Sequence, residues 1–379
     1  MLAPTTLARR LGITHDAPVI VSPSRIVIIG AGLAGLAVAA RLSFAGRDVL
    51  VLEAASRAGG QIHTLREAGL VVELGAEGFV ARSQAVPALC RLLGIEGSLV
   101  EQLSTDTYAV EAGSLELLPP GEAARRLGFQ VPVEELGRGI RSLALGMGEL
   151  TDALLARIGS ERVRVERGAR ALTRDGHALL IELGDGSRES AAAVVLAAPA
   201  RQAAELLAVV APAESAALAA APLLSNVSCN LLYRRAQFAD YPAGSGLIFP
   251  DSFADVGLRA LSLVDHKFAG RVPAEYSLLR VFFRPVADTL NSWNDERFAW
   301  EAAKAVARVL TVTGEPERAW VSRWADALPV FTPAHQSQAA AADQALQRLG
   351  IHPTGSAFHG AGIDAAAASA ALVAARLGA

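Results

Sequence analysis

The chain has 379 residues, and its 35 Lys and Arg residues nearly balance its 38 Asp and Glu residues, which gives a formal net charge of −3. This balance excludes a strong overall field that would recruit nucleic acid or anionic lipid. The length is sufficient to bury a large core and predicts two domains.

The N-terminal 24 residues lack the apolar core and cleavage pattern of a signal peptide. The longest apolar runs, residues 191–200 and 206–224, are short or interrupted by Pro and Glu, so no transmembrane helix is expected. Cys90 and Cys229 lie far apart in the chain, without metal-ligand spacing. We expect them to be reduced, partly buried thiols of a cytoplasmic protein, and we expect no metal site.

The first predicted β-α-β unit carries the strongest signal. Ile26–Ile29 predicts a strand buried on both faces, and a helix is predicted from about Leu33 to Ala45. The G-x-G-x-x-G spacing between them provides a tight turn, a close approach of backbone to a pyrophosphate, and close packing of helix on strand. The helix N-terminus would face the phosphates. The expected dinucleotide contacts here are Gly30, Ala31, Gly32, Leu33, Ala34 and Gly35.

Glu53 follows the second predicted strand, Val49–Leu52, where a carboxylate can accept hydrogen bonds from a ribose diol. A second glycine pair comes soon afterwards, which indicates an extended ligand and favours FAD over NAD. The pattern G-x-G-x-x-G…E-A-x-x-R-x-G-G resembles the signature of the flavin-containing amine oxidase superfamily. The resemblance implies further cofactor contacts at Ala54, Arg57, Gly59, Gly60 and Gln61. Gln61 stands where the family usually has Arg or Lys.

Residues 65–79 are similar to the same segment of protoporphyrinogen oxidases and their coproporphyrinogen-oxidising relatives. This resemblance implies that Gly75, Ala76 and Glu77 contact the flavin, because Gly75 permits close approach of the backbone. The alternative is that Glu73 and Glu77 are solvated carboxylates at strand ends.

The middle of the chain alternates helices and short strands. Helices are predicted at residues 86–93 and 146–159, and the stretch between them at 115–141 is expected to be irregular. Short strands are predicted at 162–166, 178–183 and 193–197, with a hairpin turn at 184–186. This block resembles the family's second FAD segment, which implies cofactor contacts at Val165 and Ala198. Ordinary β-structure is the alternative interpretation.

Antiparallel strands are predicted at residues 227–233, 246–249, 259–264 and 277–283, and a helix at 295–310. We expect this sheet to form the floor of a substrate pocket, with Phe, Tyr and Leu side chains facing in. Many amine oxidases place a lysine near the flavin, but the sequence around Lys267 matches the porphyrinogen-oxidising branch, and we favour a surface or turn position for it. Trp324 matches the family's tryptophan segment and is an expected cofactor contact.

The C-terminal segment resembles the part of the family that closes the flavin site. It contains Gly360 and Gly362 before a helix predicted at residues 365–377. The N-terminus of such a helix would stabilise the negative charge of a reduced flavin. Ser356, Gly362 and Ile363 are the implied contacts. His359 is either a substrate contact or a histidine satisfied within the fold, and Pro353 makes residues 351–354 a poor predicted strand.

The predicted fold is α/β, with a discontinuous Rossmann-like FAD-binding domain and a second α+β substrate domain built on an antiparallel sheet. We assign residues 22–85, 146–205 and 315–379 to the first domain, and residues 86–145 and 206–314 to the second. Between Tyr108 and Gly146 the chain is much shorter than the resembled enzymes, which carry a helical cap there. The substrate pocket would therefore be open, shallow or completed by another chain.

These resemblances imply an FAD-dependent oxidase of haem biosynthesis that acts on a porphyrinogen, either protoporphyrinogen IX or coproporphyrinogen III, with O2 as acceptor. No catalytic side chain is assigned, and Arg82 and His359 are candidates for substrate contact. Two alternatives stay open: a flavin oxidase or dehydrogenase of an amine or polyene, and a non-catalytic flavoprotein. We expect no nucleic-acid partner. The oligomeric state and contact with the inner face of a membrane also stay open.

Overall fold

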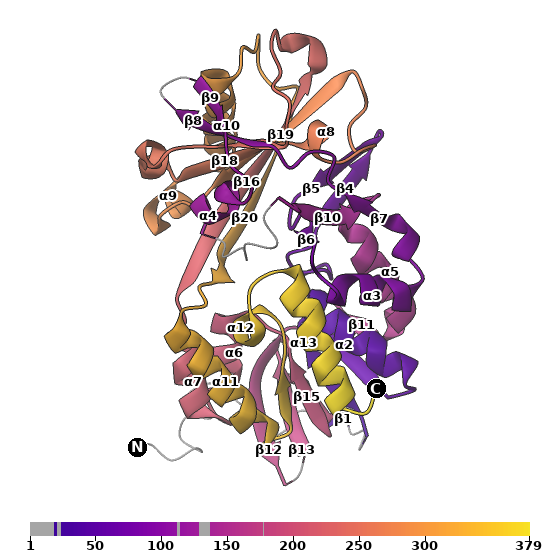
Figure 1. Cartoon of the computed structure of the whole chain (residues 1–379). Coiled ribbons are helices and arrows are strands. Elements are labelled where there is room, and N and C mark those ends of the chain that lie inside the picture. The colour runs from indigo at the N-terminus through magenta and orange to yellow at the C-terminus, as the bar shows by residue number, and fades with distance from the viewer. Residues whose placement is uncertain (1–18, 21–23, 112–113, 129–136, 177) are drawn as a thin grey trace.

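Figure 1 shows the computed structural model, which describes residues 19–20, 24–111, 114–128, 137–176 and 178–379. A parallel sheet and a long antiparallel sheet lie in two lobes, and the C-terminal helix α13 (Ile363–Arg376) packs in the lobe of the parallel sheet. The predicted combination of a Rossmann-like unit and an antiparallel unit is confirmed.

The parallel sheet contains the predicted β-α-β unit. Its described strands are ordered β11 (Val163–Arg164), β3 (Val49–Leu52), β2 (Ile26–Ile29), β15 (Ala193–Leu196) and β21 (Ile351–Pro353). Every residue of β2 is buried, as its continuous apolar run predicts for a strand covered on both faces. Residues 351–354, which the sequence predicts only as a poor strand, do contain β21. This strand lies at the sheet edge, where Pro353 is tolerated opposite Leu196.

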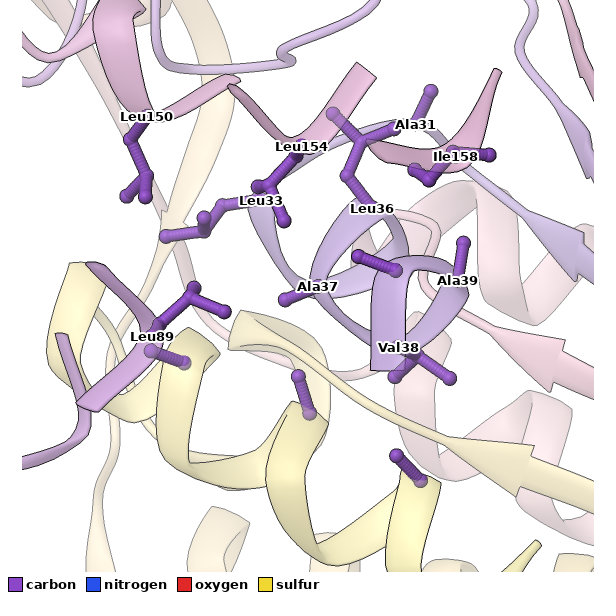
Figure 2. Close-up of a cluster of buried hydrophobic side chains, with 14 of the residues drawn as sticks. Ala31, Leu33, Leu36, Ala37, Val38, Ala39, Leu89, Leu150, Leu154 and Ile158 are labelled. Atoms are coloured by element: carbon purple, nitrogen blue, oxygen red, sulfur yellow. The ribbon is translucent and has the colours of Figure 1, made fainter. Parts of the chain in front are cut away.

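Alternate residues of β2 belong to different cores. Ile26 and Ile28 pack with α2 (Leu33–Phe44), α5 (Gly148–Ile158) and α13, whereas Val27 and Ile29 pack on the opposite face. Figure 2 shows the first core, where apolar side chains of α2, α3 (Ala85–Leu93) and α5 meet beside α13. The second core is covered by a smaller sheet, β1 (Val19–Ile20), β14 (Arg188–Ala191), β13 (Ala178–Leu183) and β12 (Ala169–Asp175), and by the helices α6 (Ala200–Leu207), α7 (Pro212–Ala219) and α11 (Pro333–Gln347).

The antiparallel strands predicted in the middle of the chain are confirmed, and their sheet is longer than expected. Its described order is β20 (Arg318–Pro329), β16 (Leu223–Arg234), β19 (Tyr276–Phe283), β18 (Leu258–Leu263), β17 (Gly246–Ile248), β8 (Thr107–Glu111) and β9 (Ser114–Leu117). The pair β17–β8 is parallel and the other neighbours are antiparallel.

One face of this sheet is covered by α10 (Asp295–Val309). On that face Leu231, Tyr233 and Phe283 of the sheet pack with Phe298 of the helix. The expectation that the Phe, Tyr and Leu side chains face a substrate pocket is therefore wrong for this face, because these side chains form a core. The opposite face lies toward the hairpin of β4 (Thr64–Glu67) and β5 (Leu70–Glu73), where Leu278 packs with both β5 and its own sheet.

Several local predictions need correction. The stretch expected to be irregular, 115–141, contains part of β9, α4 (Glu122–Arg126) and the start of β10 (Ile140–Leu143), and residues 129–136 of it lie outside the described residues. β10 pairs with β6 (Phe79–Val80) and β7 (Leu99–Glu101). The sequence did not reveal β12 and β14, and the strand expected at 162–166 is only β11. Short helices complete the described fold, namely α8 (Val264–Lys267), α9 (Ala287–Ser292) and α12 (Ser356–His359).

The predicted domain division stays a prediction, but two elements pack with the domain to which they were not assigned. α3 falls in the range given to the substrate domain, yet Val86 and Leu89 belong to the core beside α13. β20 falls in the range given to the FAD-binding domain, yet it pairs with β16 from Leu223 opposite Pro329 to Leu232 opposite Arg318.

None of the helices in the described part of the chain combines the length and the apolar character that a membrane crossing requires. Among the same residues, no group of three or more His, Cys, Asp or Glu side chains is arranged to hold a metal ion.

Candidate functional site

The carboxyl edge of the parallel sheet gathers residues that are far apart in the chain. In spatial order, β11, β3, β2, β15 and β21 are followed closely by Val165, Glu53, Gly30, Ala198 and Ser356. β3 and β15 lie on opposite sides of β2, so the strand order reverses at β2. Ligands of open parallel sheets bind at the carboxyl edge beside such a reversal. At this edge the structure thus brings together five residues predicted to contact the cofactor, one after each strand.

Two glycines of the first motif are required by the chain itself. Gly30 has a φ of +104°, a conformation that side chains disfavour. A Cβ on Gly35 would lie 2.0 Å from the carbonyl oxygen of Gly30, so glycine lets α2 begin this close to β2. Gly32, in contrast, has an ordinary φ of −71°, and a Cβ there would meet nothing within 4 Å. The chain leaves the space beside Gly32 open, as a bound pyrophosphate would require.

Glu53 lies beside this motif and is oriented by two backbone N–H groups. Its Oε2 accepts a hydrogen bond from the Ala31 N–H at 2.8 Å, and its Oε1 accepts one from the Ala55 N–H at 2.8 Å. Because each carboxylate oxygen has further lone pairs, both can still accept from ribose hydroxyls. The exposed Ala54 follows directly in the chain.

The second glycine pair lies against the first motif. The Gly59 N–H donates to the Ala31 carbonyl at 2.8 Å, and Gly59 forms a parallel bridge with Gly32. A Cβ on Gly60 would lie 3.0 Å from the Gly32 Cα. Glycine at position 60 therefore lets the two loops touch backbone to backbone.

Arg57 holds this second loop in place. Its guanidinium donates to the carbonyl oxygens of Ala58, Gly60 and Ile62 at 3.1, 2.7 and 3.0 Å. Arg57 and Val165, two predicted cofactor contacts from distant segments, also line one hollow of about 560 Å³. A hollow of this volume is within the range of ligand sites.

Gly75 allows a close approach between two chain segments. A Cβ on Gly75 would lie 2.0 Å from the Gln61 carbonyl oxygen, and the Ala76 N–H donates to that oxygen at 2.8 Å. This packing explains the glycine without a ligand, and the flavin contacts of Gly75 and Ala76 stay predictions. The Gln61 side chain donates to the Ala327 carbonyl at 2.8 Å and so links this loop to β20.

Glu73 and Glu77 are buried, with side chains 3% and 9% exposed. The interpretation of solvated strand-end carboxylates is therefore wrong. Glu77 Oε2 lies 2.6 Å from Lys267 Nζ, and the lysine side chain is itself only 13% exposed. The expected surface position of Lys267 is also wrong, because its ammonium group lies in the interior beside a residue predicted to contact the flavin.

The two carboxylates differ in their pKa. Burial opposes ionisation of Glu77, but the positive charges of Lys267, Arg280 and Arg271 outweigh burial and lower its pKa. For Glu73 burial is the larger effect and raises its pKa, although Arg271 is nearby. Glu77 is thus held as a carboxylate.

Helix α13 begins at Ile363 with an open space before it. Gly362 has a φ of +102°, and a Cβ there would meet nothing within 4 Å. Asp364, in the first turn, accepts a hydrogen bond from Ser83, which ties this helix end to the segment before α3. A helix N-terminus carries partial positive charge and is suited to an anionic ligand.

The other predicted residues have partners within the fold or face solvent. Trp324 donates its Nε1–H to the Leu74 carbonyl at 3.2 Å. The His359 Nε2 lies 3.2 Å from the Pro353 carbonyl, which favours a histidine satisfied within the fold. Arg82 is exposed in the segment between β6 and α3. Substrate contact by Arg82 and His359 stays a prediction.

Arg271 and Arg280 have no predicted role, yet they are fully or nearly fully buried next to Glu73 and Glu77. The available signal was Arg280 itself, a charged residue inside the apolar run of β19. The hydrogen bond between Asp364 and Ser83 joins distant segments and corresponds to no local sequence pattern, so the sequence could not predict it.

The described residues fit FAD. Open spaces beside Gly32 and Gly362 lie at the N-termini of α2 and α13, and Glu53 offers free lone pairs near the first of them. Backbone N–H groups at helix N-termini bind phosphate and other anionic groups. The contacts predicted for individual residues stay predictions.

Comparison with known proteins gives matches along nearly the whole chain. The family model for flavin-containing amine oxidoreductase matches residues 33–128 and 115–378. A coproporphyrinogen III oxidase from Propionibacterium freudenreichii subsp. freudenreichii is 34% identical over 227 residues, which cover 59% of this chain and 42% of that relative. The chain therefore matches less than half the length of this relative.

A coproporphyrinogen III oxidase from Bacillus subtilis (strain 168) is 22% identical over an alignment of 446 residues, covering 89% of this chain and 94% of the relative. Among solved structures, a protein from Exiguobacterium sp. 255-15 assigned as a protoporphyrinogen oxidase superposes with a TM-score of 0.80 at 22% identity. The superposition covers 94% of this chain and 99% of the other. It confirms the predicted fold.

Proposed function

Because the chain belongs to the family of flavin-containing amine oxidoreductases, we propose that it is an FAD-dependent oxidase whose substrate is a porphyrinogen. The observation that carries the FAD part is the convergence of five strand ends on one edge of the parallel sheet, beside Gly32, whose Cβ position is open. The support for a porphyrinogen is that relatives described as coproporphyrinogen III oxidases match this chain, one of them over 89% of its length.

The chain's own residues would bind and orient the cofactor. Glu53 would accept hydrogen bonds from the ribose hydroxyls, the N-terminus of α2 beside Gly32 would bind the pyrophosphate, and the N-terminus of α13 beside Gly362 would stabilise negative charge on the ring system. FAD, when bound, would supply the redox chemistry, a two-electron oxidation of the substrate with O2 as the final acceptor and H2O2 as the co-product. Complete oxidation of a porphyrinogen to the porphyrin would consume three molecules of O2.

The substrate would bind between the FAD site and the antiparallel sheet, on the face of that sheet not covered by α10. Ser228, Asn230 and Arg280 of this face are buried against the end of β5 and the residues that follow it, so the substrate would lie beside them and not on them. The proposed substrates are coproporphyrinogen III and protoporphyrinogen IX, which differ in how many carboxylates they carry, and haem biosynthesis is the proposed pathway.

The test uses purified full-length protein loaded with FAD. Each porphyrinogen is supplied under air, and porphyrin fluorescence and H2O2 are followed together, with an anaerobic reaction as control. We expect a yellow protein that forms porphyrin and H2O2 in a ratio of one to three, with turnover only when O2 is present. A panel of primary amines, polyamines and amino acids is assayed in parallel.

Each other outcome would replace the proposal. H2O2 release with an amine and none with a porphyrinogen would identify an amine oxidase. Bound FAD that reduces photochemically, reacts with none of these substrates and is not reoxidised by air would identify a non-catalytic flavoprotein. A colourless protein that takes up no FAD would refute the function at its first step.

A further inference from the structure

Five ionisable side chains lie buried where the β4–β5 hairpin and the residues after it meet the antiparallel sheet. We call them the buried charge cluster: Glu73, Glu77, Lys267, Arg271 and Arg280. Lys267 is the most exposed of them, at 13% of its side chain. Charged side chains are almost never buried unless they have a function or a matching partner.

Two of the three cations have carboxylate partners. Lys267 Nζ lies 2.6 Å from Glu77 Oε2, and Arg271 Nη1 lies 3.6 Å from Glu73 Oε1. Arg271 also donates to the Ser142 hydroxyl at 2.6 Å. These contacts hold the carboxylates of Glu73 and Glu77 in place on either side of Gly75 in the chain.

Arg280 is the third cation, and it is only 3% exposed. Its guanidinium donates to the Gly75 carbonyl at 2.6 Å and to the Ser228 hydroxyl at 3.0 Å. Among the described residues, no carboxylate oxygen lies within ion-pair distance of it, and its Nε has no hydrogen-bond partner. Arg280 therefore brings into the interior a positive charge that has no ion-paired carboxylate among the described residues.

The charge count of the cluster is three cations against two carboxylates. Arginine stays protonated in proteins. Burial raises the pKa of Glu73, so protonation there would only enlarge the positive surplus. The neighbouring Cys229 stays neutral, because burial raises the pKa of its thiol to about 12. An uncompensated buried charge is costly, so this surplus calls for a negative group bound nearby.

The backbone that Arg280 holds indicates which negative group this is. Gly75, Ala76 and Glu77 are the residues predicted to lie against the flavin, and Arg280 binds the Gly75 carbonyl directly. We propose that the surplus positive charge of the buried charge cluster stabilises the negative charge that bound FAD gains on reduction. This inference rests on the FAD binding proposed above, and it assigns Lys267, Arg280 and Glu77 as positioning residues that set the reduction equilibrium.

The experiment measures the reduction equilibrium of bound FAD against a reference dye of known potential, under anaerobic conditions and without substrate. Three variants change the cluster charge in steps. Lys267→Gln removes one positive charge, Glu77→Gln removes one negative charge, and the double variant Lys267→Gln with Glu77→Gln restores the original net charge. Lys267→Arg, which keeps the charge, is the matched control.

We expect Lys267→Gln to shift the equilibrium at least tenfold toward oxidised FAD, about 30 mV for a two-electron couple. We expect Glu77→Gln to shift it a similar amount in the opposite direction. The double variant and Lys267→Arg should stay near the natural protein. A loss of local structure alone would not produce opposite signs in the single variants and recovery in the double variant.

The results separate this inference from the proposed function. A natural protein that takes up no FAD refutes the proposed function and this inference with it. FAD that binds to all variants with one unchanged equilibrium, or with shifts of the same sign in both single variants, refutes this inference alone. If Lys267→Gln does not fold, Glu77→Gln decides, because only the proposed charge effect moves its equilibrium toward reduced FAD.

Discussion

Replacing Gly32 by alanine separates what the fold requires from what the cofactor requires. Gly32 is the N-cap of α2 with a φ of −71°, and the added Cβ would meet nothing within 4 Å. Alanine restricts the unfolded chain and gains about 0.4 to 1 kcal/mol, whereas losing glycine at an N-cap costs a comparable amount. We therefore expect the free energy of unfolding without FAD to change by less than about 1 kcal/mol.

The same methyl group would stand in the open space where backbone is expected to approach the pyrophosphate. Losing one hydrogen bond to a charged group costs about 1.5 to 3 kcal/mol, which corresponds to about tenfold to hundredfold weaker FAD binding. The assay is titration of the protein with FAD, followed by flavin fluorescence, alongside urea unfolding of the protein without FAD.

Two further glycines provide controls. Gly97→Ala also places a Cβ in open space, but Gly97 belongs to neither glycine motif, and the change should leave FAD affinity unchanged. Gly35→Ala places its Cβ 2.0 Å from the Gly30 carbonyl oxygen, and the forced backbone movement should lower the free energy of unfolding by about 3 kcal/mol. The reasoning is refuted if Gly32→Ala binds FAD as tightly as the natural protein, or if it destabilises the protein as much as Gly35→Ala.

Glu53→Gln replaces the acceptor of the Ala31 N–H, which is also the proposed acceptor of the ribose hydroxyls, so FAD affinity measured by the same titration should fall about tenfold or more. Burial raises the pKa of the Cys90 and Cys229 thiols to about 11 and about 12, so neither should react with a disulfide reagent at pH 8 until the protein is unfolded. Because unfolded thiols titrate near 9.0, the free energy of unfolding should fall as the pH rises above that value, which urea unfolding at pH 8 and pH 10 can show. Burial and Arg376 lower the pKa of His352, so stability is lost as the pH falls below 6.5. His352→Gln should show a smaller loss between pH 7 and pH 5, and an equal loss in both proteins would contradict this.

The sequence predicted the elements whose signals are local. The apolar run Ile26–Ile29 and the glycine spacing after it placed β2, the turn and α2, because burial on both faces and the close approach of Gly35 act within one unit. Gly362 and the alanine-rich stretch after it likewise placed α13. The strands that end before Gly30, Glu53 and Ala197 carried such local signals, whereas Val165 after β11 and the proline in β21 made those two strand ends weaker predictions.

The sequence did not show which distant segments would touch. Gly75 was interpreted through a ligand, but its nearest neighbour is the carbonyl of Gln61, and nothing in either segment specifies that pairing. Arg57 was assigned to the cofactor and also holds the carbonyl groups of its own loop. β12 was missed because its alternation is weak and its pairing with β13 is bulged between Ala169 and Ala171.

Two residues of the buried charge cluster break a local rule of this chain. Arg280 interrupts the apolar run of β19, where a buried strand would ordinarily place another aliphatic side chain. Lys267 is one of only two lysines in a chain whose other basic side chains are arginine, and it lies 2.6 Å from a buried carboxylate. A fold selected for stability alone would gain from apolar replacements at such positions, since buried ion pairs seldom improve on well-packed hydrophobic side chains. Retaining three cations beside two carboxylates is therefore better explained by a bound negative charge than by folding, and it is the charge balance of Arg280, Lys267 and Glu77 that the reduction measurements address.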